Sequence, residues 1–394
     1  MSIPVLSSES SVLGIIEAVR GERGYFSDRS PSMKVFTIAL MPGDGIGPDI
    51  VPPCYELLRD AAAATGGFSL ERVDIEAGAA HYRKTGDGFP EERFEAAKKA
   101  DAILLGAMGL PDVRYPDGRE ITPQLELRER LDLYAGVRPV KVYPGVPPIL
   151  ASEKYPEIDF VLVRESTEGL FAFRAEGVVE NDSAREVLQL TRRGCERIYD
   201  FSFNLVRRRK NQGGKNRLTC VDKANVFRSF KFARDIFAER SKRHPDVRVD
   251  YCYVDAMAMN MVKRPWDYDV MVMENQFGDI LSDLGAALMG GLGMAPSADI
   301  GDAHAVFQPC HGSAPDIMGQ DKANPLAMFL SGVLLLDWLA DTRDCPEAGA
   351  AARLVENAIV QTLASGTIKP FEFGGTTGTR AISDAVRETL AKMS

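Results

Sequence analysis

The chain has 394 residues, of which 45% are hydrophobic and 26% are charged. At about 150 residues per domain this length predicts two or three compact lobes, and the apolar content argues against a disordered or fibrous chain. With 47 basic and 56 acidic residues, the net charge of −9 argues against constitutive nucleic-acid binding.

Residues 1–32 stand apart from the rest of the chain. They are rich in serine, carry one short amphipathic piece and precede the first core strand. We therefore interpret them as a dispensable or non-native extension and place the start of the fold at Met33. They lack the basic and apolar regions of a signal peptide, so we expect a cytoplasmic protein.

The apolar run Phe36–Met41 predicts a buried strand that leads into a glycine-rich turn. In this turn Pro48 occupies the last glycine position of GxGxxG, and no GK[ST] follows, so a Rossmann or P-loop site is not predicted. Helical spacing follows over residues 49–64, where Pro52–Pro53 places the start of the helix at or just before Cys54.

Further short apolar runs alternate with amphipathic segments. These runs are Ala102–Leu105, Phe160–Val163, Leu218–Val221, Val249–Val254 and Val270–Met273. The alternation predicts an α/β fold. The basic run Arg207–Lys210 follows a helical stretch and is interpreted as a solvated helix end.

The longest apolar stretch, Leu326–Ala340, is interrupted by Ser331 and Asp337. It is shorter than the roughly 18 unbroken apolar residues of a membrane span, so it predicts a buried helix and no membrane partner. Asn324 supplies the expected N-cap and Pro325 the first turn. The cysteines form no CxxC pair, which predicts neither a disulfide framework nor a thiolate zinc site. They are Cys54, Cys195, Cys220, Cys252, Cys310 and Cys345.

Several basic residues follow or flank the predicted strands. Arg128 and Arg138 are separated by ten positions, and Arg164 ends a strand. Guanidinium groups that converge from different elements would suit a small polycarboxylate, although each one alone could equally form a surface ion pair. Lys223 also follows a strand, where open α/β sheets place their ligands.

Two carboxylates in FGDILSD, Asp279 and Asp283, fall on one face of a predicted helix. Their flanks are apolar or small, so solvation is partial and a divalent cation is the favoured partner. Asp255 closes another strand and is a third candidate ligand.

The loop HGSAPD is followed by KANP and contains small residues with one carboxylate. Such a loop could hold an adenosine, with Asp316 accepting hydrogen bonds from the ribose hydroxyls.

Together these motifs resemble the β-decarboxylating dehydrogenases, the family of isocitrate, 3-isopropylmalate, homoisocitrate, tartrate and D-malate dehydrogenases. The matching strings run from about Met33 to the C-terminus. They are LMPGDGIGPDI, ILLGAMG, LRERLDLYAGVRPVK, VRESTEG, VDKANV, NQFGDILSD and HGSAPDIMGQDKANP.

The resemblance implies a two-lobed, isopropylmalate-dehydrogenase-like α/β fold that is not a Rossmann fold. Residues 33–133 and 290–394 would form a discontinuous large, coenzyme-binding lobe, and residues 134–289 an inserted lobe that forms the dimer. Members pair as homodimers in which a lysine and an aspartate enter the neighbour's site, which implies a shared active site for Lys223 and Asp255.

The implied reaction is the NAD-dependent oxidative decarboxylation of a (2R)-malate-type hydroxy acid, a dicarboxylate or tricarboxylate. The resemblance assigns roles residue by residue. Asp255, Asp279 and Asp283 would hold Mg²⁺ or Mn²⁺, Lys223 would act as the base with Asp255 beside it, and Arg128, Arg138, Arg164, Thr122 and Gln124 would bind substrate. The coenzyme would lie against His311, Gly312, Ser313, Ala314, Asp316 and Asn324.

Two departures from the family pattern bear on the reaction. Phe171 stands where relatives usually carry the tyrosine that protonates the enol, and Gln308 stands where they often carry glutamate. Thr122 and Gln124 occupy the positions that choose the substrate, and their polarity favours a polar or small substituent over isopropyl.

The main rival interpretation is a non-catalytic regulatory subunit of a related dehydrogenase. The loss of a phenol at Phe171 favours it. The presence of Lys223, the aspartates and the three arginines argues against it, as it does against a purely structural binding module.

Overall fold

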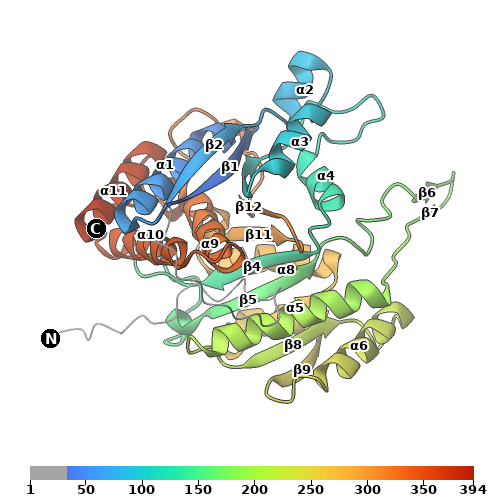
Figure 1. Ribbon diagram of the computed structural model, residues 1–394. Coiled ribbons are helices and arrows are strands. Elements are labelled where there is room, and N and C mark those ends of the chain that lie inside the picture. Colours follow the sequence, from blue (N-terminus) through green and yellow to red (C-terminus); the bar gives the residue numbers. More distant parts are fainter. Residues whose placement is uncertain (1–32) are drawn as a thin grey trace.

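The computed structural model describes residues 33–394, so the predicted extension over residues 1–32 lies outside the described residues (Figure 1). The strands are β1 (Lys34–Gly43), β2 (Phe68–Asp74), β3 (Ala102–Ala107), β4 (Ala135–Lys141), β5 (Asp159–Glu165), β6 (Val178–Val179), β7 (Ala184–Arg185), β8 (Arg217–Asp222), β9 (Arg248–Tyr253), β10 (Val270–Met273), β11 (Pro296–Ile300) and β12 (Ala305–Pro309).

The α-helices are α1 (Gly47–Thr65), α2 (Ala79–Thr85), α3 (Glu91–Lys99), α4 (Pro123–Arg130), α5 (Arg192–Lys210), α6 (Arg228–Ser241), α7 (Val254–Lys263), α8 (Asn275–Leu288), α9 (Leu326–Thr342), α10 (Pro346–Ala364) and α11 (Thr379–Met393). Short 3-10 turns are η3 (Tyr155–Glu157), η4 (Pro265–Asp267), η5 (Leu292–Met294), η6 (Pro315–Ile317) and η7 (Phe371–Phe373).

One ten-stranded sheet, in the order β2-β1-β3-β12-β11-β4-β5-β10-β8-β9, runs through the molecule. Strands β2, β1, β3 and β12 are parallel neighbours, as are β5, β10, β8 and β9, and β11 and β4 between them pair antiparallel. The C-terminal strands β11 and β12 therefore lie beside the N-terminal strands, whereas the middle of the chain forms the other half of the sheet. The domain boundaries at 133 and 289 stay predictions.

The α/β fold class is confirmed, and each predicted strand falls on an observed one. Strands β6 and β7 form a separate two-stranded hairpin that projects from the body (Figure 1). Helices α1, α9, α10 and α11 pack against one another beside the first half of the sheet, and α5 packs on α6, β5, β8 and β10 in the second half.

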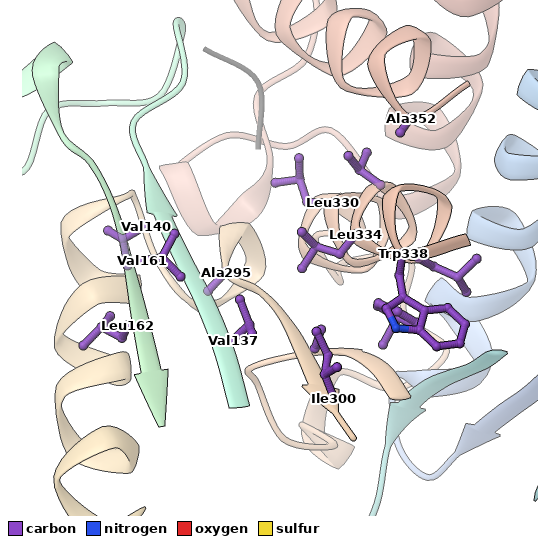
Figure 2. Close-up of a cluster of buried hydrophobic side chains, with 14 of the residues drawn as sticks. Val137, Val140, Val161, Leu162, Ala295, Ile300, Leu330, Leu334, Trp338 and Ala352 are labelled. Atoms are coloured by element: carbon purple, nitrogen blue, oxygen red, sulfur yellow. The ribbon is translucent and has the colours of Figure 1, made fainter. Parts of the chain in front are cut away.

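Helix α9 is the buried helix that the apolar stretch predicted. Its residues from Leu326 to Leu339 are all buried. Leu330, Leu334 and Trp338 lie near Ile300 of β11 and Val137 of β4, which join the two halves of the sheet (Figure 2). One continuous apolar cluster thus contains residues from both halves of the sheet.

The start of α1 was predicted wrongly. The helix begins at Gly47 rather than near Cys54, and Pro52 and Pro53 lie inside it. Ile50 and Val51 are fully buried in its first turns. Their apolar burial offsets the backbone hydrogen bonds that the two prolines cannot donate.

The cap of α9 and the basic end of α5 also differ from prediction. Pro325 occupies the N-cap of α9, and the preceding Asn324 accepts a hydrogen bond from the backbone N–H of Leu326 at 3.3 Å. Arg209 is not solvated, because it is buried with Nε 2.7 Å from Asp269 and Nη2 2.9 Å from Asp159. These partners are distant in sequence, so the basic run alone could not reveal them.

All six cysteines are free thiols. Within residues 33–394, no helix combines the length and apolar character needed to cross a membrane.

Candidate active site

A cavity of about 300 Å³ opens where β3, β5 and β12 end. This is the edge of the sheet where open α/β folds place their ligands. It brings together many of the predicted site residues. The predicted residues that line it are Thr122, Gln124, Arg128, Arg138, Arg164, Asp279, Asp283, His311 and Gly312, together with Phe171 and Gln308.

Arg128 on α4 and Arg138 on β4 meet at one side of this cavity. Both contact the buried carboxylate of Asp299 on β11, Arg128 through Nε at 3.0 Å and Arg138 through Nη2 at 3.5 Å. Nη1 of Arg138 is buried and finds no hydrogen-bond partner within residues 33–394. A buried guanidinium with an unused donor is suited to an anionic ligand.

Arg164, at the end of β5, is held by two groups on α8. Its Nε donates to Oδ1 of Asn275 at 2.8 Å, and its Nη1 pairs with Asp279. Burial, together with repulsion from Arg128, lowers the pKa of Arg164 to about 10. The ring of Phe171 lies 5.0 Å from its guanidinium carbon, within the range of a cation–π contact.

Asp279 and Asp283 both lie on α8, one turn apart, as the i,i+4 spacing predicts. Glu274 caps this helix by accepting a hydrogen bond from the N–H of Phe277. Burial, and then the negative charge of Asp279, raise the pKa of Asp283. A cation between the two carboxylates would relieve both penalties. In the described part of the chain, no three His, Cys, Asp or Glu side chains cluster tightly enough to hold a metal.

Lys223 and Asp255 are paired with each other and do not line the cavity. Lys223 follows β8, and Asp255 lies in the first turn of α7 after β9. The hydrogen bond from Lys223 lowers the pKa of the exposed Asp255 carboxylate. Because β8 and β9 run parallel to β5, this pair lies on the same edge of the sheet as the cavity, two and three strands away from Arg164.

The predicted coenzyme residues form a continuous loop from the cavity outward. His311 and Gly312 line the cavity, and Nε2 of His311 is buried with no partner among residues 33–394. The backbone oxygen of Ser313 accepts a hydrogen bond from Ile46 at 2.8 Å, which fastens the loop to the glycine-rich turn. At Gly45 of that turn a Cβ would lie 1.8 Å from the same oxygen, so only glycine fits.

Farther along this loop, Ala314 adopts φ 37°, and Asp316 is exposed on η6. Asn324, a predicted coenzyme residue, already uses its amide in two hydrogen bonds. Its Nδ2 donates to Glu372 at 2.9 Å and its Oδ1 accepts from Leu326.

The prediction from sequence missed Asp299. The only local signal was a carboxylate inside the short apolar strand PSADI, since a charge in a buried strand requires a partner. Its partners lie 161 and 171 residues away, so the sequence could not identify them.

Comparison with known proteins places these features in a family. The family model described as isocitrate/isopropylmalate dehydrogenase matches residues 37–386. A 3-isopropylmalate/3-methylmalate dehydrogenase of Methanocaldococcus jannaschii is 40% identical, with 90% of this chain and 98% of that protein covered. A tartrate dehydrogenase/decarboxylase of Pseudomonas putida is 37% identical, with 91% of this chain and 98% of that protein covered.

The fold is also found among solved structures. The crystal structure of isocitrate dehydrogenase from Methylococcus capsulatus matches with a TM-score of 0.77 and 32% identity. The match covers 90% of this chain and 99% of that one.

Proposed function

Because the chain belongs to the isocitrate/isopropylmalate dehydrogenase family, we propose that its cavity oxidises and decarboxylates a malate substituted at C3, with NAD⁺ as the coenzyme and Mg²⁺ or Mn²⁺ as the metal. The chain is a β-decarboxylating dehydrogenase. The non-catalytic subunit is therefore set aside. The observation that carries the proposal is that three guanidinium groups and two carboxylates line one cavity.

Arg128, Arg138 and Arg164 would bind the two carboxylates of the substrate. The unused Nη1 of Arg138 offers a buried donor for one of them. Arg164, already oriented by Asn275, would hold the other. Two carboxylates fixed by planar donors present the C2 hydroxyl and the C3 carboxylate in one orientation.

Asp279 and Asp283 fit a divalent cation, since both are oxygen donors on one helical face and the pKa of Asp283 is raised by burial and then by the negative charge of Asp279. When bound, the metal would polarise the oxygen on C2. His311, Gly312, Ser313, Ala314 and Asp316 would hold the coenzyme, which would accept the hydride from C2.

Lys223 would take the proton of the C2 hydroxyl, and Asp255 would complete the metal site. Because this pair does not line the cavity of its own chain, we propose that both residues act in the site of a second copy. Helices α7 and α8 pack together and expose Met259, Val262 and Ile280, an apolar surface that suits pairing of two copies. The cytoplasmic location stays a prediction.

The substituent at C3 would be polar or small. Gln124 and Thr122 line the cavity, and Oε1 of Gln124 is buried without a partner within residues 33–394. A hydroxyl on C3 would pair with the amide, whereas an isopropyl group would leave it unpaired at a cost of about 1–3 kcal/mol. Tartrate, which carries this hydroxyl, is therefore expected to be a better substrate than 3-isopropylmalate, and Gln124→Leu should move the ratio of kcat/KM toward 3-isopropylmalate.

The test measures NADH formation with Mn²⁺ for D-malate, tartrate, isocitrate and 3-isopropylmalate, with CO₂ release followed in parallel. NADH formation with at least one of the four acids, abolished in Asp283→Asn, is the expected result. A wild-type protein that binds Mn²⁺ and substrate yet forms no NADH with any of them contradicts the proposal.

A further inference from the structure

Asp299 lies behind the cavity and holds three of the side chains that line it. Its Oδ2 accepts hydrogen bonds from Nε of Arg128 at 3.0 Å and from Nε2 of Gln308 at 2.7 Å. Its Oδ1 lies 3.5 Å from Nη2 of Arg138. Asp299 itself is 1% exposed and does not line the cavity, whereas its three partners do.

The charges around Asp299 explain why an acid is needed at this position. Arg128, Arg138 and Arg164 converge on one cavity and repel one another. Burial alone would raise the pKa of Asp299, but Arg128 and Arg138 outweigh this effect and lower it, so the side chain stays ionised. It is the buried anion shared by two of the three arginines.

The contacts also leave the arginines able to bind a ligand. Asp299 engages Nε of Arg128 and one terminal nitrogen of Arg138, and Nη1 of Arg138 is not used by any hydrogen-bond partner within residues 33–394. The aspartate, which does not line the cavity, therefore fixes the orientation of the two guanidinium groups from behind it.

Gln308 on β12 is matched to this aspartate. Its amide donates to Asp299, so an acid at position 308 would put two carboxyl groups at hydrogen-bond distance, where they must either repel each other or bind an extra proton. We propose that Asp299 and Gln308 form a matched acid–amide pair that positions Arg128 and Arg138 for the substrate carboxylate. The inference rests on the proposed function, because that function makes these arginines substrate ligands.

The test uses the full-length enzyme with Mn²⁺ and compares wild type with Asp299→Asn, Gln308→Glu and the double variant. Asp299→Asn leaves two amides in contact and Gln308→Glu leaves two acids, so each single variant removes the acid–amide pair. Each should raise the KM for the best hydroxy acid by about tenfold or more and leave the KM for NAD⁺ unchanged. The double variant restores one acid and one amide but places the acid at 308 instead of 299, so its KM should rise by less than the product of the two single effects.

Asp302→Asn serves as the matched control, since Asp302 is an exposed aspartate just after β11 that does not line the cavity. It should leave both KM values unchanged. If the rise in KM in the double variant equals the two single effects combined, Asp299 and Gln308 do not act as a pair. If the KM values of the single variants are unchanged, the positioning role is wrong.

Thermal unfolding separates a failure of this inference from a failure of the proposed function. If the wild type oxidises none of the four acids, the proposed function fails. The pair is then still tested, because each single variant should lower the unfolding midpoint and the double variant should lower it by less than the two single losses combined. If the double variant loses as much stability as the two single variants combined, the pair is contradicted, whether or not the enzyme is active.

Discussion

The guanidinium of Arg164 is paired with the carboxylate of Asp279. A residue expected to bind substrate thus contacts one expected to bind the metal, and Asn275 holds the arginine in place from the same helix. When both bind, the cation can replace Arg164 as the partner of Asp279, and the substrate carboxylate can replace Asp279 as the partner of Arg164. We therefore expect metal and substrate to bind with positive coupling.

Asp279→Asn should weaken Mn²⁺ binding by about tenfold or more, because a neutral amide replaces one of the three proposed anionic ligands. The dissociation constant is measured by titration calorimetry with and without D-malate or tartrate. Asp235→Asn, on the exposed face of α6, is the control. Unchanged Mn²⁺ affinity in Asp279→Asn would contradict the metal assignment.

NAD⁺ should be used far better than NADP⁺. Asp316 is exposed at the predicted coenzyme loop, where it would accept two ribose hydroxyls and repel a 2′-phosphate. No lysine or arginine stands in HGSAPDIMGQ to receive that phosphate. The measurement is kcat/KM for each coenzyme, and comparable values would show that Asp316 does not discriminate.

Phe171→Tyr should speed the last protonation of the product. Phe171 lines the cavity beside Arg164 but cannot donate a proton, and a positioned acid typically contributes about 10²–10⁴-fold. Hydride transfer should not change. Single-turnover NADH formation is compared with the appearance of ketone product in both versions. Equal, fast appearance of both products in wild type, unaffected by the substitution, would mean that another group already supplies the proton.

The stability of the protein should depend on pH through Glu165. Burial raises the pKa of this carboxyl to about 7, even though the N–H groups of Thr167 and Glu168 donate to it. Between its ordinary pKa and about 7 the folded protein keeps a proton that the unfolded chain has lost. The free energy of unfolding therefore decreases as pH rises through this range, by about 3–4 kcal/mol at most, and levels off above it.

Glu165→Gln imitates the protonated form, so it should remove this part of the pH dependence. Unfolding midpoints at pH 5 and pH 8 are compared for wild type, Glu165→Gln and the exposed control Glu153→Gln. The same pH dependence in all three proteins would show that Glu165 is ionised in the fold.

The sequence predicted most of the fold because its strands are short apolar runs, and the segments between them show helical spacing or turn residues. It placed Asp279 and Asp283 on one helical face for a similar reason, since they are neighbours on one helix. It failed where a distant contact decides the local structure. Buried Ile50 and Val51 extend α1 across two prolines, and Arg209 is buried by two aspartates from other strands and loops.

The same limit applies to the candidate site. Arg128 and Arg138 could be named from the motifs, but the aspartate that holds them is brought in by the C-terminal part of the chain. The separation of Lys223 from the cavity could not be read from motif spacing alone. It follows from the order of β5, β10, β8 and β9 in the sheet.

The central claim is that two copies of the chain build each active site, with Lys223 and Asp255 from one copy and Asp279 and Asp283 from the other. Subunit complementation tests it most directly. Lys223→Met and Asp283→Asn are each inactive by prediction, and a mixed dimer has one site with both changes and one site with neither.

The measurement is NADH formation with Mn²⁺ and the best hydroxy acid after the two variants are unfolded together, refolded and checked for dimers. Random pairing should restore about a quarter of the wild-type activity, because half of the dimers are mixed and each has one intact site. Mixed dimers that form but recover no activity would contradict the shared site and with it the account given for Lys223 and Asp255.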